Sequence, residues 1–226
     1  MNARICFTLA AAVLFFCSPG LGQSAQPTPV PKASDKVNAR PTPQPSAEPF
    51  DGATVKEMAA KCVRLATGSG DIDIELYPES APESVRNFLN LTATGAFDTT
   101  TFSRVVTGFV IQGGSLWTRE GGVSMELSRR ARRIVPDEPN HILHERGVMS
   151  MARSDEPNTA TTHFFILVDT APSLDGKFAA FGRVTKGMDV VDAINKMPVE
   201  GEKPVKPVRI NKASIAACVS AAADVR

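Results

Sequence analysis

The sequence predicts a mainly β fold, a closed antiparallel barrel with helices packed at its ends. The first observation is a series of short apolar runs, each bounded by Gly, Pro, Asn or Asp, as strands commonly are. The second is that only two segments space their apolar residues as helices do. Many short strands with two helices favour a barrel. The strand-like runs are 102–106, 109–111, 148–151, 164–168, 179–184 and 208–218, and the helical segments are 82–94 and 188–196.

A β-hairpin is expected at the start of the folded part. Residues 61–66 have the composition of a strand, and residues 71–76 alternate polar and apolar side chains as a half-buried strand does. The Thr-Gly-Ser-Gly sequence of residues 67–70 is typical of a hairpin turn. These segments predict the first two strands.

The first helix is expected to begin at Pro82. Ser80 can cap it, Pro82 suits its first turn, and Glu83 meets the positive end of the helix dipole. Gly95 is expected to end the helix, because glycine readily adopts the left-handed conformation common at that position.

The first 22 residues have the pattern of a secretory signal peptide. A short basic start is followed by an apolar run over residues 5–16 and then by small and helix-breaking residues up to Gly22. The run is shorter than the about 20 residues that a stable membrane span requires. We therefore expect export, with the periplasm as destination. A buried N-terminal helix is the alternative. A lipid anchor on Cys17 is a further alternative. It is disfavoured because Phe16 stands directly before Cys17, where a lipoprotein is expected to have a small residue.

A Pro-rich spacer is expected between the signal peptide and the folded domain. Residues 23–53 contain seven Pro among Gln, Ser, Thr, Ala and Lys, with few large apolar side chains. Such a segment cannot bury enough surface to offset the entropy of ordering it. We expect a disordered linker over 23–53 and one folded domain over 54–226. A Pro-rich ligand site is the alternative.

Charge gives no argument for nucleic acid or an anionic membrane as a partner. The chain has 25 Lys and Arg against 24 Asp and Glu, a net charge of +1. The basic run 129–133 is interpreted as a solvated loop, with a partner contact as the alternative.

Neither a metal site nor a hydrolytic site is expected. The spacing of His141, His144 and His163 matches no compact metal-binding motif. Ser150 and Asp175 lie in no Gly-x-Ser-x-Gly context, so they do not make a convincing triad with a His. We expect no cofactor.

The segment 102–114 is the most informative part of the chain. It places Arg104 and Gln112 among residues that are otherwise almost all apolar or Gly. A charge in an apolar run is costly unless it is paired or functional. The segment is therefore a candidate for the functional site.

The same segment resembles the signature of the cyclophilin-type peptidyl-prolyl isomerases. Further blocks resemble the family in the same order, over about 61–217, at residues 147–152, 157–159, 164–166, 174–177, 181–184 and 187–191. The resemblance implies an eight-stranded closed antiparallel barrel with a helix capping each end. Ser173 and Phe178 resemble exported bacterial members in particular.

The resemblance also implies the roles of individual residues. Arg104 would donate to the prolyl nitrogen of the twisted amide, Gln112 would contact the rotating carbonyl, and Phe109 would hold the Pro ring. Rotation about an X-Pro bond breaks no covalent bond, so no nucleophile, base or metal is required. The implied catalytic residues are Arg104, Phe109 and Gln112, and the implied substrate-binding residues are Val110, Ala152, Arg153, Phe165, Leu174 and Phe178.

Four positions depart from common family residues. Ser173 stands where many eukaryotic members have Trp, and Phe178 where His is common. Val110 replaces a common Met, and Arg153 a common Asn. The missing Trp implies weak or no binding of cyclosporin, because its indole usually donates a hydrogen bond to that ligand.

Two Cys remain once the signal peptide is removed. Cys62 and Cys218 could form one disulfide in an oxidising compartment, or stay as two buried thiols, and the residues alone leave both open. The resemblance makes the first and last strands neighbours, which favours the disulfide if the register allows it.

The sequence supports three kinds of function in this order. The first is a monomeric exported isomerase that acts on Pro-containing peptides and folding proteins. The second is a binding module that holds Pro-containing segments with little turnover. The third is a scaffold at the end of a Pro-rich tether. Retention of Arg104 favours the first.

Overall fold

The structure, a computed structural model, describes residues 47–218. The predicted signal peptide (1–22) and most of the predicted spacer (23–46) lie outside the described residues. Within residues 47–218, no helix combines the length and apolar character needed to cross a membrane.

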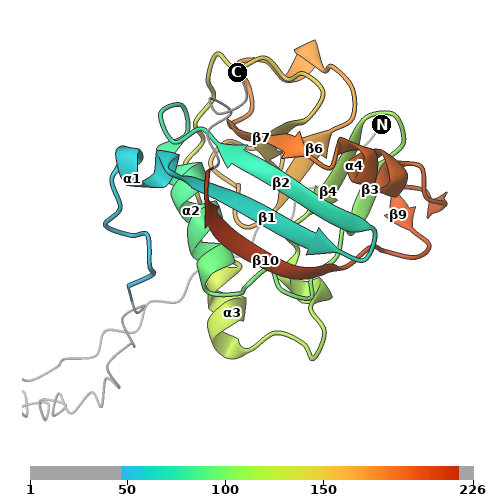
Figure 1. The fold of residues 1–226 in the computed structure, drawn as a ribbon, viewed down its shortest axis with the longest axis horizontal. Helices are drawn as coiled ribbons and strands as arrows, with labels where there is room; N and C mark the ends of the chain where they lie inside the picture. The colour runs from blue at the N-terminus through green and yellow to red at the C-terminus, as the bar shows by residue number, and fades with distance from the viewer. Residues whose placement is uncertain (1–46, 219–226) are drawn as a thin grey trace, which may run out of the picture. The chain divides into compact units, whose positions relative to one another are not determined.

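The fold is built on one antiparallel sheet of eight strands (Figure 1). Neighbouring strands follow the order β10-β1-β2-β7-β5-β6-β4-β3. Two further short strands, β8 and β9, pair as a separate hairpin. The strands are β1 (Lys61–Thr67), β2 (Gly70–Leu76), β3 (Arg104–Val106), β4 (Val110–Gly113), β5 (Val148–Met151), β6 (Phe164–Leu167), β7 (Ala180–Lys186), β8 (Val199–Glu200), β9 (Lys203–Pro204) and β10 (Ile210–Ala217). Every strand predicted from the sequence is present, with ends shifted by no more than two residues.

The eight antiparallel strands are confirmed, whereas closure of the barrel stays a prediction. The sheet forms a half-barrel, and in the part of the chain that the structure describes no strand ladder joins its edges, β10 and β3. The segments that lead into the two edge strands nevertheless bond to each other. Thr101 and Arg209 form an isolated bridge, the Phe102 N–H donates to the Val208 carbonyl (2.9 Å), and the Ile210 N–H donates to the Thr100 carbonyl (2.8 Å). Strand β3 itself has three residues and pairs with β4.

Two longer helices pack against the sheet. Helix α2 (Pro82–Ala93) contacts β10 and β7, and helix α4 (Met188–Asn195) contacts β2, β4 and β3. The remaining helices are the short segments α1 (Val55–Ala59), η1 (Leu116–Thr118), α3 (Met125–Arg130) and η2 (Pro172–Leu174).

The start of α2 is stabilised by a distant residue. Ser80 was expected to cap the helix, but the cap position is Ala81, which makes no side-chain bond. Instead, the Glu138 carboxylate accepts from the backbone N–H of Glu83 (2.9 Å) and of Ser84 (2.8 Å). An anion from another part of the chain thus satisfies the free N–H groups at the positive end of the helix.

The basic run 129–133 is only in part the solvated loop that was expected, since three of its Arg are exposed and the fourth, Arg130, is not. Its first residues belong to α3, which Ser124 caps by accepting from the Leu127 N–H. Arg130 and Arg133 both pair with Glu48, and the Arg130 side chain is only 10% exposed. The contact that orders this run comes from a residue 82 positions away, so local sequence does not reveal it.

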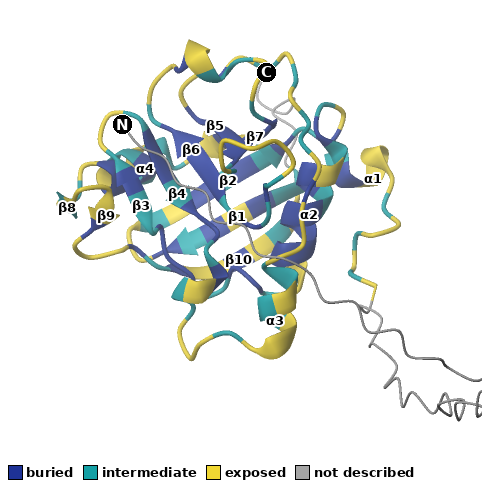
Figure 2. Ribbon diagram, turned by 180° about the vertical axis from the view of Figure 1, so that it is seen from behind, coloured by how far each residue is buried: buried dark blue, intermediate teal, exposed yellow. Residues whose placement is uncertain are grey.

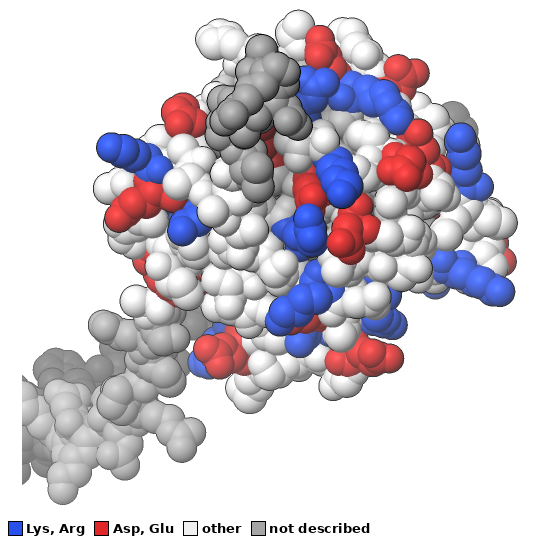
Figure 3. Space-filling view, viewed as in Figure 1, with Lys and Arg blue, Asp and Glu red and all other residues white. Residues whose placement is uncertain are grey.

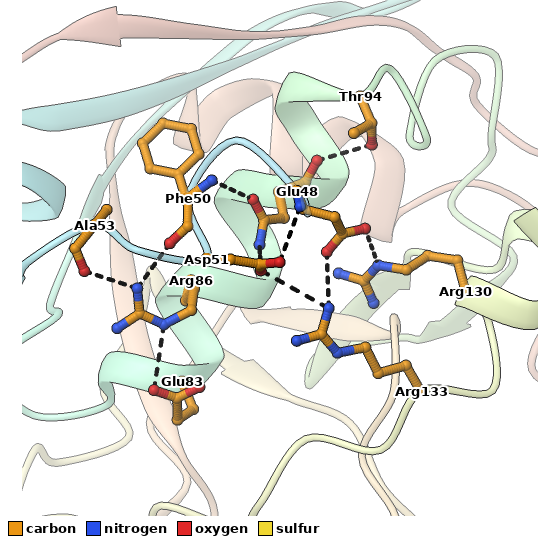
Figure 4. Close-up of polar contacts among 10 residues, drawn as sticks. Glu48, Phe50, Asp51, Ala53, Glu83, Arg86, Thr94, Arg130 and Arg133 are labelled. Carbon is orange, nitrogen blue, oxygen red and sulfur yellow. Dashed lines mark hydrogen bonds and ion pairs between the residues drawn. The ribbon is translucent and has the colours of Figure 1, made fainter. Parts of the chain in front are cut away.

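Residues 47–53, placed in the spacer by the sequence argument, are bonded to the domain (Figure 4). The Phe50 N–H donates to the Asn90 side chain (2.7 Å), and the Arg86 guanidinium donates to the carbonyls of Phe50 and Ala53 (both 2.7 Å). Glu48 adds two ion pairs, one with Arg130 of α3 and one with Arg133, three residues after the end of that helix. The ordered part therefore begins before Thr54.

The core divides into two clusters on opposite faces of the sheet. Buried residues lie along the strands of the sheet and on α2 (Figure 2). Along β6, Phe164 and Ile166 belong to the main core, whereas Phe165 and Leu167 belong to the second cluster. This is the alternation expected of a strand with two buried faces. In the main core Phe88 lies 5.3 Å from Phe164, ring centre to ring centre, in an edge-to-face contact.

A disulfide ties the first strand of the sheet to the last. Cys62 of β1 and Cys218, directly after β10, are bonded, with their Cα atoms 4.9 Å apart. The register pairs Cys62 with Ala216, and the Cys218 N–H continues the ladder to the Ala60 carbonyl (3.2 Å). The sequence left open whether Cys62 and Cys218 form a disulfide or stay as two thiols, and the structure contains the disulfide.

Reduction of this disulfide is expected to destabilise the domain by about 2–5 kcal/mol, because the bridge closes a loop of well over 100 residues. Denaturant midpoints of the oxidised protein, the reduced protein and Cys62→Ser measure the loss. Intact masses before and after reduction count the thiols. Equal midpoints, or an unchanged thiol count, would contradict the structural role.

Candidate active site

Strand register brings three of the expected residues into one row. Arg104 of β3 pairs directly with Gln112 of β4, and Gln112 pairs with Phe165 of β6. Directly paired residues have Cβ atoms about 4.5–5.5 Å apart on the same face. Their neighbours along the two strands, Val105 and Ile111, belong to the main core. The row therefore lies on the opposite face of the sheet, with the second cluster.

All nine expected site residues line a single pocket of about 140 Å³. Arg104, Val110, Gln112 and Phe165 come from strands. Phe109 lies in the turn between β3 and β4, and the remaining residues lie in segments after β5 and in and after η2. The pocket is lined by Arg104, Phe109, Val110, Gln112, Ala152, Arg153, Phe165, Leu174 and Phe178.

The walls of the pocket are mostly apolar. Phe165 is 6% exposed and stands edge to face with Phe178, with ring centres 6.0 Å apart. Phe109, Leu174 and Phe178 pack against the second cluster while remaining partly accessible. Such a pocket suits a small apolar group held next to a few oriented polar groups.

Arg104 is one of two cationic residues that line this pocket, the other being Arg153. Nη1 of Arg104 donates to Oε1 of Gln112 (3.1 Å), and its Nε and Nη2 donate to the two carboxylate oxygens of Glu202 (2.6 and 3.1 Å). Hydrogen bonding to the Arg104 guanidinium lowers the pKa of the Glu202 carboxyl, so that group is ionised at neutral pH. The sequence led us to expect that the Arg104 charge is either paired or functional, and the structure shows that it is paired.

Glu202 was not identified from the sequence. It is 98 residues from Arg104 and lies in the polar segment Glu-Gly-Glu-Lys, which looks like any exposed turn. Only the folded chain brings this carboxylate to the guanidinium.

The side chain of Arg153 is bonded to the protein itself, and its expected part in binding substrate stays a prediction. Its guanidinium donates to the carbonyls of Ser154 (2.8 Å) and Lys177 (3.2 Å), so the protein's own backbone occupies it. Its Cζ lies 4.7 Å from the centre of the Phe178 ring, a cation–π distance. Arg153 thus connects two segments of the pocket wall and also lines the pocket itself.

Ser150, His144 and Asp175 form a hydrogen-bonded row that the sequence argument did not expect. Ser150 Oγ is 3.0 Å from His144 Nε2, and His144 Nδ1 is 3.0 Å from Asp175 Oδ1. Ser150 is 0% exposed and His144 1% exposed, so no substrate reaches the hydroxyl. A bond from the His144 backbone N–H is the main cause that lowers the pKa of Asp175. The row joins β5 to the segment after Leu174 and is no hydrolytic site.

A second hollow of about 240 Å³ adjoins the pocket and shares three of its residues. His163 lies on its wall, and burial lowers the pKa of this imidazole. His163 is therefore neutral at pH 7. The second hollow is lined by Gln112, Ala152, Arg153, Ser154, Thr159, Thr161 and His163.

The described residues contain no group of three or more His, Cys, Asp or Glu that could hold a metal ion. On the face drawn in Figure 3, basic and acidic side chains are interspersed and form no continuous basic patch.

Comparisons with known proteins agree with this geometry. The family model described as cyclophilin type peptidyl-prolyl cis-trans isomerase/CLD matches residues 62–215. Peptidyl-prolyl cis-trans isomerase cypE of Dictyostelium discoideum is 39% identical over 158 residues, 70% of this chain and 99% of that protein. The peptidyl-prolyl cis-trans isomerase of Acinetobacter baylyi is 36% identical over 163 residues, 68% of this chain and 84% of that protein.

A solved structure shows the same fold. The crystal structure of a cyclophilin type peptidyl-prolyl cis-trans isomerase of Cryptosporidium parvum, in the presence of the dipeptide Ala-Pro, matches with a TM-score of 0.61 and 31% identity. The match covers 70% of this chain and 99% of that one. The chain belongs to the cyclophilin family. It is a peptidyl-prolyl cis-trans isomerase, as the resemblance predicted. Membership of an exported bacterial group stays a prediction.

The stability of the domain is expected to fall as the pH is lowered below about 6.5, the ordinary pKa of His. Since burial lowers the pKa of His163 in the folded state, the unfolded chain binds a proton that the folded chain does not. This contribution is fully present above the unfolded pKa and is lost as the pH falls through the folded pKa. Urea midpoints at about pH 7.5 and about pH 5.5 measure the change.

His163→Asn is expected to reduce this pH dependence. His141→Asn, at an exposed position, is the matched control and should leave it unchanged. An identical loss of stability in wild type and His163→Asn would contradict the assignment.

Proposed function

We propose that the protein accelerates rotation about X-Pro bonds in exported proteins as they fold, and that Arg104 stabilises the twisted amide by donating to the prolyl nitrogen. One observation carries the proposal. The guanidinium of Arg104 and the amide of Gln112 stand hydrogen-bonded to each other at the edge of an apolar pocket.

The chemistry requires a donor rather than a nucleophile. Amide resonance gives X-Pro rotation a barrier of about 18–20 kcal/mol. When the bond twists, the prolyl nitrogen pyramidalises and regains a lone pair. A donor aimed at that lone pair binds the twisted state more strongly than the planar one and so raises the rate. Arg suits the role because it stays protonated and offers donors in fixed geometry.

The pocket residues hold the substrate around the rotating bond. Phe109, Phe165 and Leu174 form the apolar walls that would take the Pro ring. Gln112, which accepts a hydrogen bond from Arg104, would contact the rotating carbonyl. Val110, Ala152 and Phe178 complete the substrate-binding surface. The Cryptosporidium relative, whose structure was determined in the presence of Ala-Pro, supports Pro-containing peptides as the substrate class.

The partners that we propose are unfolded and folding chains with accessible Pro. We expect the protein to act as a monomer. Nothing in the charge balance favours nucleic acid.

Export to the periplasm is proposed from the signal-like residues 1–22. The disulfide between Cys62 and Cys218 supports this, because such bonds form and persist in oxidising compartments. An intact-mass measurement of the exported protein also shows where its N-terminus lies. We expect a chain that begins shortly after Gly22.

Arg104→Ala is expected to slow isomerisation of an Ala-Pro peptide roughly 10- to 100-fold, since one charge-assisted bond is worth about 1.5–3 kcal/mol. A protease-coupled or NMR exchange assay measures the rate. Arg129→Ala, at an exposed position of α3, is the matched control and should keep the wild-type rate. Equal rates for wild type and Arg104→Ala would refute the proposed role.

Cyclosporin is expected to bind weakly, because the exposed Ser173, directly before Leu174 of the pocket, provides no indole N–H. Ser173→Trp should strengthen binding roughly two- to tenfold, the value of one neutral hydrogen bond. Ser173→Phe adds a ring without that donor and is the control. Titration of the ligand against peptide isomerisation measures both. Equal affinities for the Trp and Phe variants would exclude the hydrogen-bond explanation.

A further inference from the structure

We propose that Glu202 is a positioning residue of this isomerase, which holds the guanidinium of Arg104 in the orientation that the reaction uses. The inference rests on the proposed role of Arg104. Glu202 does not line the pocket, so it acts only through the arginine.

The hairpin that carries Glu202 is attached next to Arg104. Glu202 and Gly201 form the two-residue turn between β8 and β9, with Gly201 at φ +64°, in the left-handed region that favours glycine. The Glu202 carbonyl accepts from the backbone N–H of Val105 (2.8 Å), the residue after Arg104. The carboxylate is therefore delivered by a turn that is bonded to the strand of the catalytic residue.

The contact fixes the guanidinium from two sides. Glu202 accepts from Nε and Nη2 through its two oxygens, and Gln112 accepts from Nη1. A guanidinium has five N–H groups, so three are engaged and two remain for a substrate. Glu202 takes the edge of the guanidinium formed by Nε and Nη2, and Gln112 takes one N–H of Nη1. One N–H on Nη1 and one on Nη2 are left. The free N–H groups are thus confined to the Nη1 and Nη2 end of the fork.

Exposure shows that the pair is suited to orientation rather than to stability. The side chains of Arg104 and Glu202 are 40% and 56% exposed. Ion pairs this accessible add little to folding stability. An unrestrained Arg, however, samples many rotamers and loses that freedom when it must meet a nitrogen lone pair. Prior restraint by Glu202 reduces this cost in the transition state.

The opposite effect is the main alternative. A carboxylate this close could compete with substrate for the guanidinium, in which case its removal would raise the rate. The two possibilities differ in sign, so kinetics separate them.

The test compares Glu202→Gln and Glu202→Ala with wild type in the full chain, using an Ala-Pro peptide. Gln keeps one acceptor and loses the charge, whereas Ala loses both. We expect kcat/KM to fall in the order wild type, Gln, Ala, by roughly three- to tenfold for Ala, with the change mainly in kcat. Glu200→Gln, on the same hairpin, is the matched control and should keep the wild-type values. Melting temperatures of all variants should stay close to wild type.

A double-mutant cycle with Arg104→Ala distinguishes positioning from a general structural role. If Glu202 acts through Arg104, Glu202→Ala costs nothing further in the Arg104→Ala background. A loss of the same size in both backgrounds would overturn the inference, as would a wild-type or raised rate in Glu202→Ala alone. If Arg104→Ala itself matched wild type, the proposed catalytic role would fail instead.

Discussion

The site depends on the register of three short strands. Because side chains alternate along a strand, a slip of one residue between β3 and β4 would move Arg104 from the pocket face into the main core. Val105, Ile111 and Ile166 are fully or almost fully buried in that core, which resists such a slip. Hydrophobic burial on one face of the sheet therefore keeps the polar row of Arg104 and Gln112 on the other.

The far side of the pocket is organised by polar contacts beneath and beside an apolar surface. Arg153 lies against Phe178 and donates to backbone carbonyls of the segments on either side. The buried row of Ser150, His144 and Asp175 connects the strand next to Phe165 with the segment after Leu174. Buried polar groups that are satisfied in this way specify one arrangement. Aromatic residues of the second cluster thus keep defined positions although they are partly exposed.

The proposed chemistry requires a cation that remains accessible and still has a defined direction. Full burial would impose a large desolvation cost on Arg104, and full exposure would leave its rotamers unrestrained. A half-exposed position between Gln112 and Glu202 avoids both. The same geometry leaves donors at one end of the guanidinium, which is what a transition state with a developing lone pair requires.

Much of the protein followed from the sequence alone. Alternating and apolar runs placed the strands to within two residues, and the Arg104 to Gln112 segment with its family-like blocks indicated all nine residues of the pocket, because such signals are local in the chain. Only the tertiary structure showed the half-barrel form of the sheet, the capping of α2 by Glu138, the ion pair of Glu48 with Arg130, and the ion pair of Glu202 with Arg104. Each of these last three joins residues more than 50 positions apart, and a charged side chain in a polar segment carries no local sign of its partner.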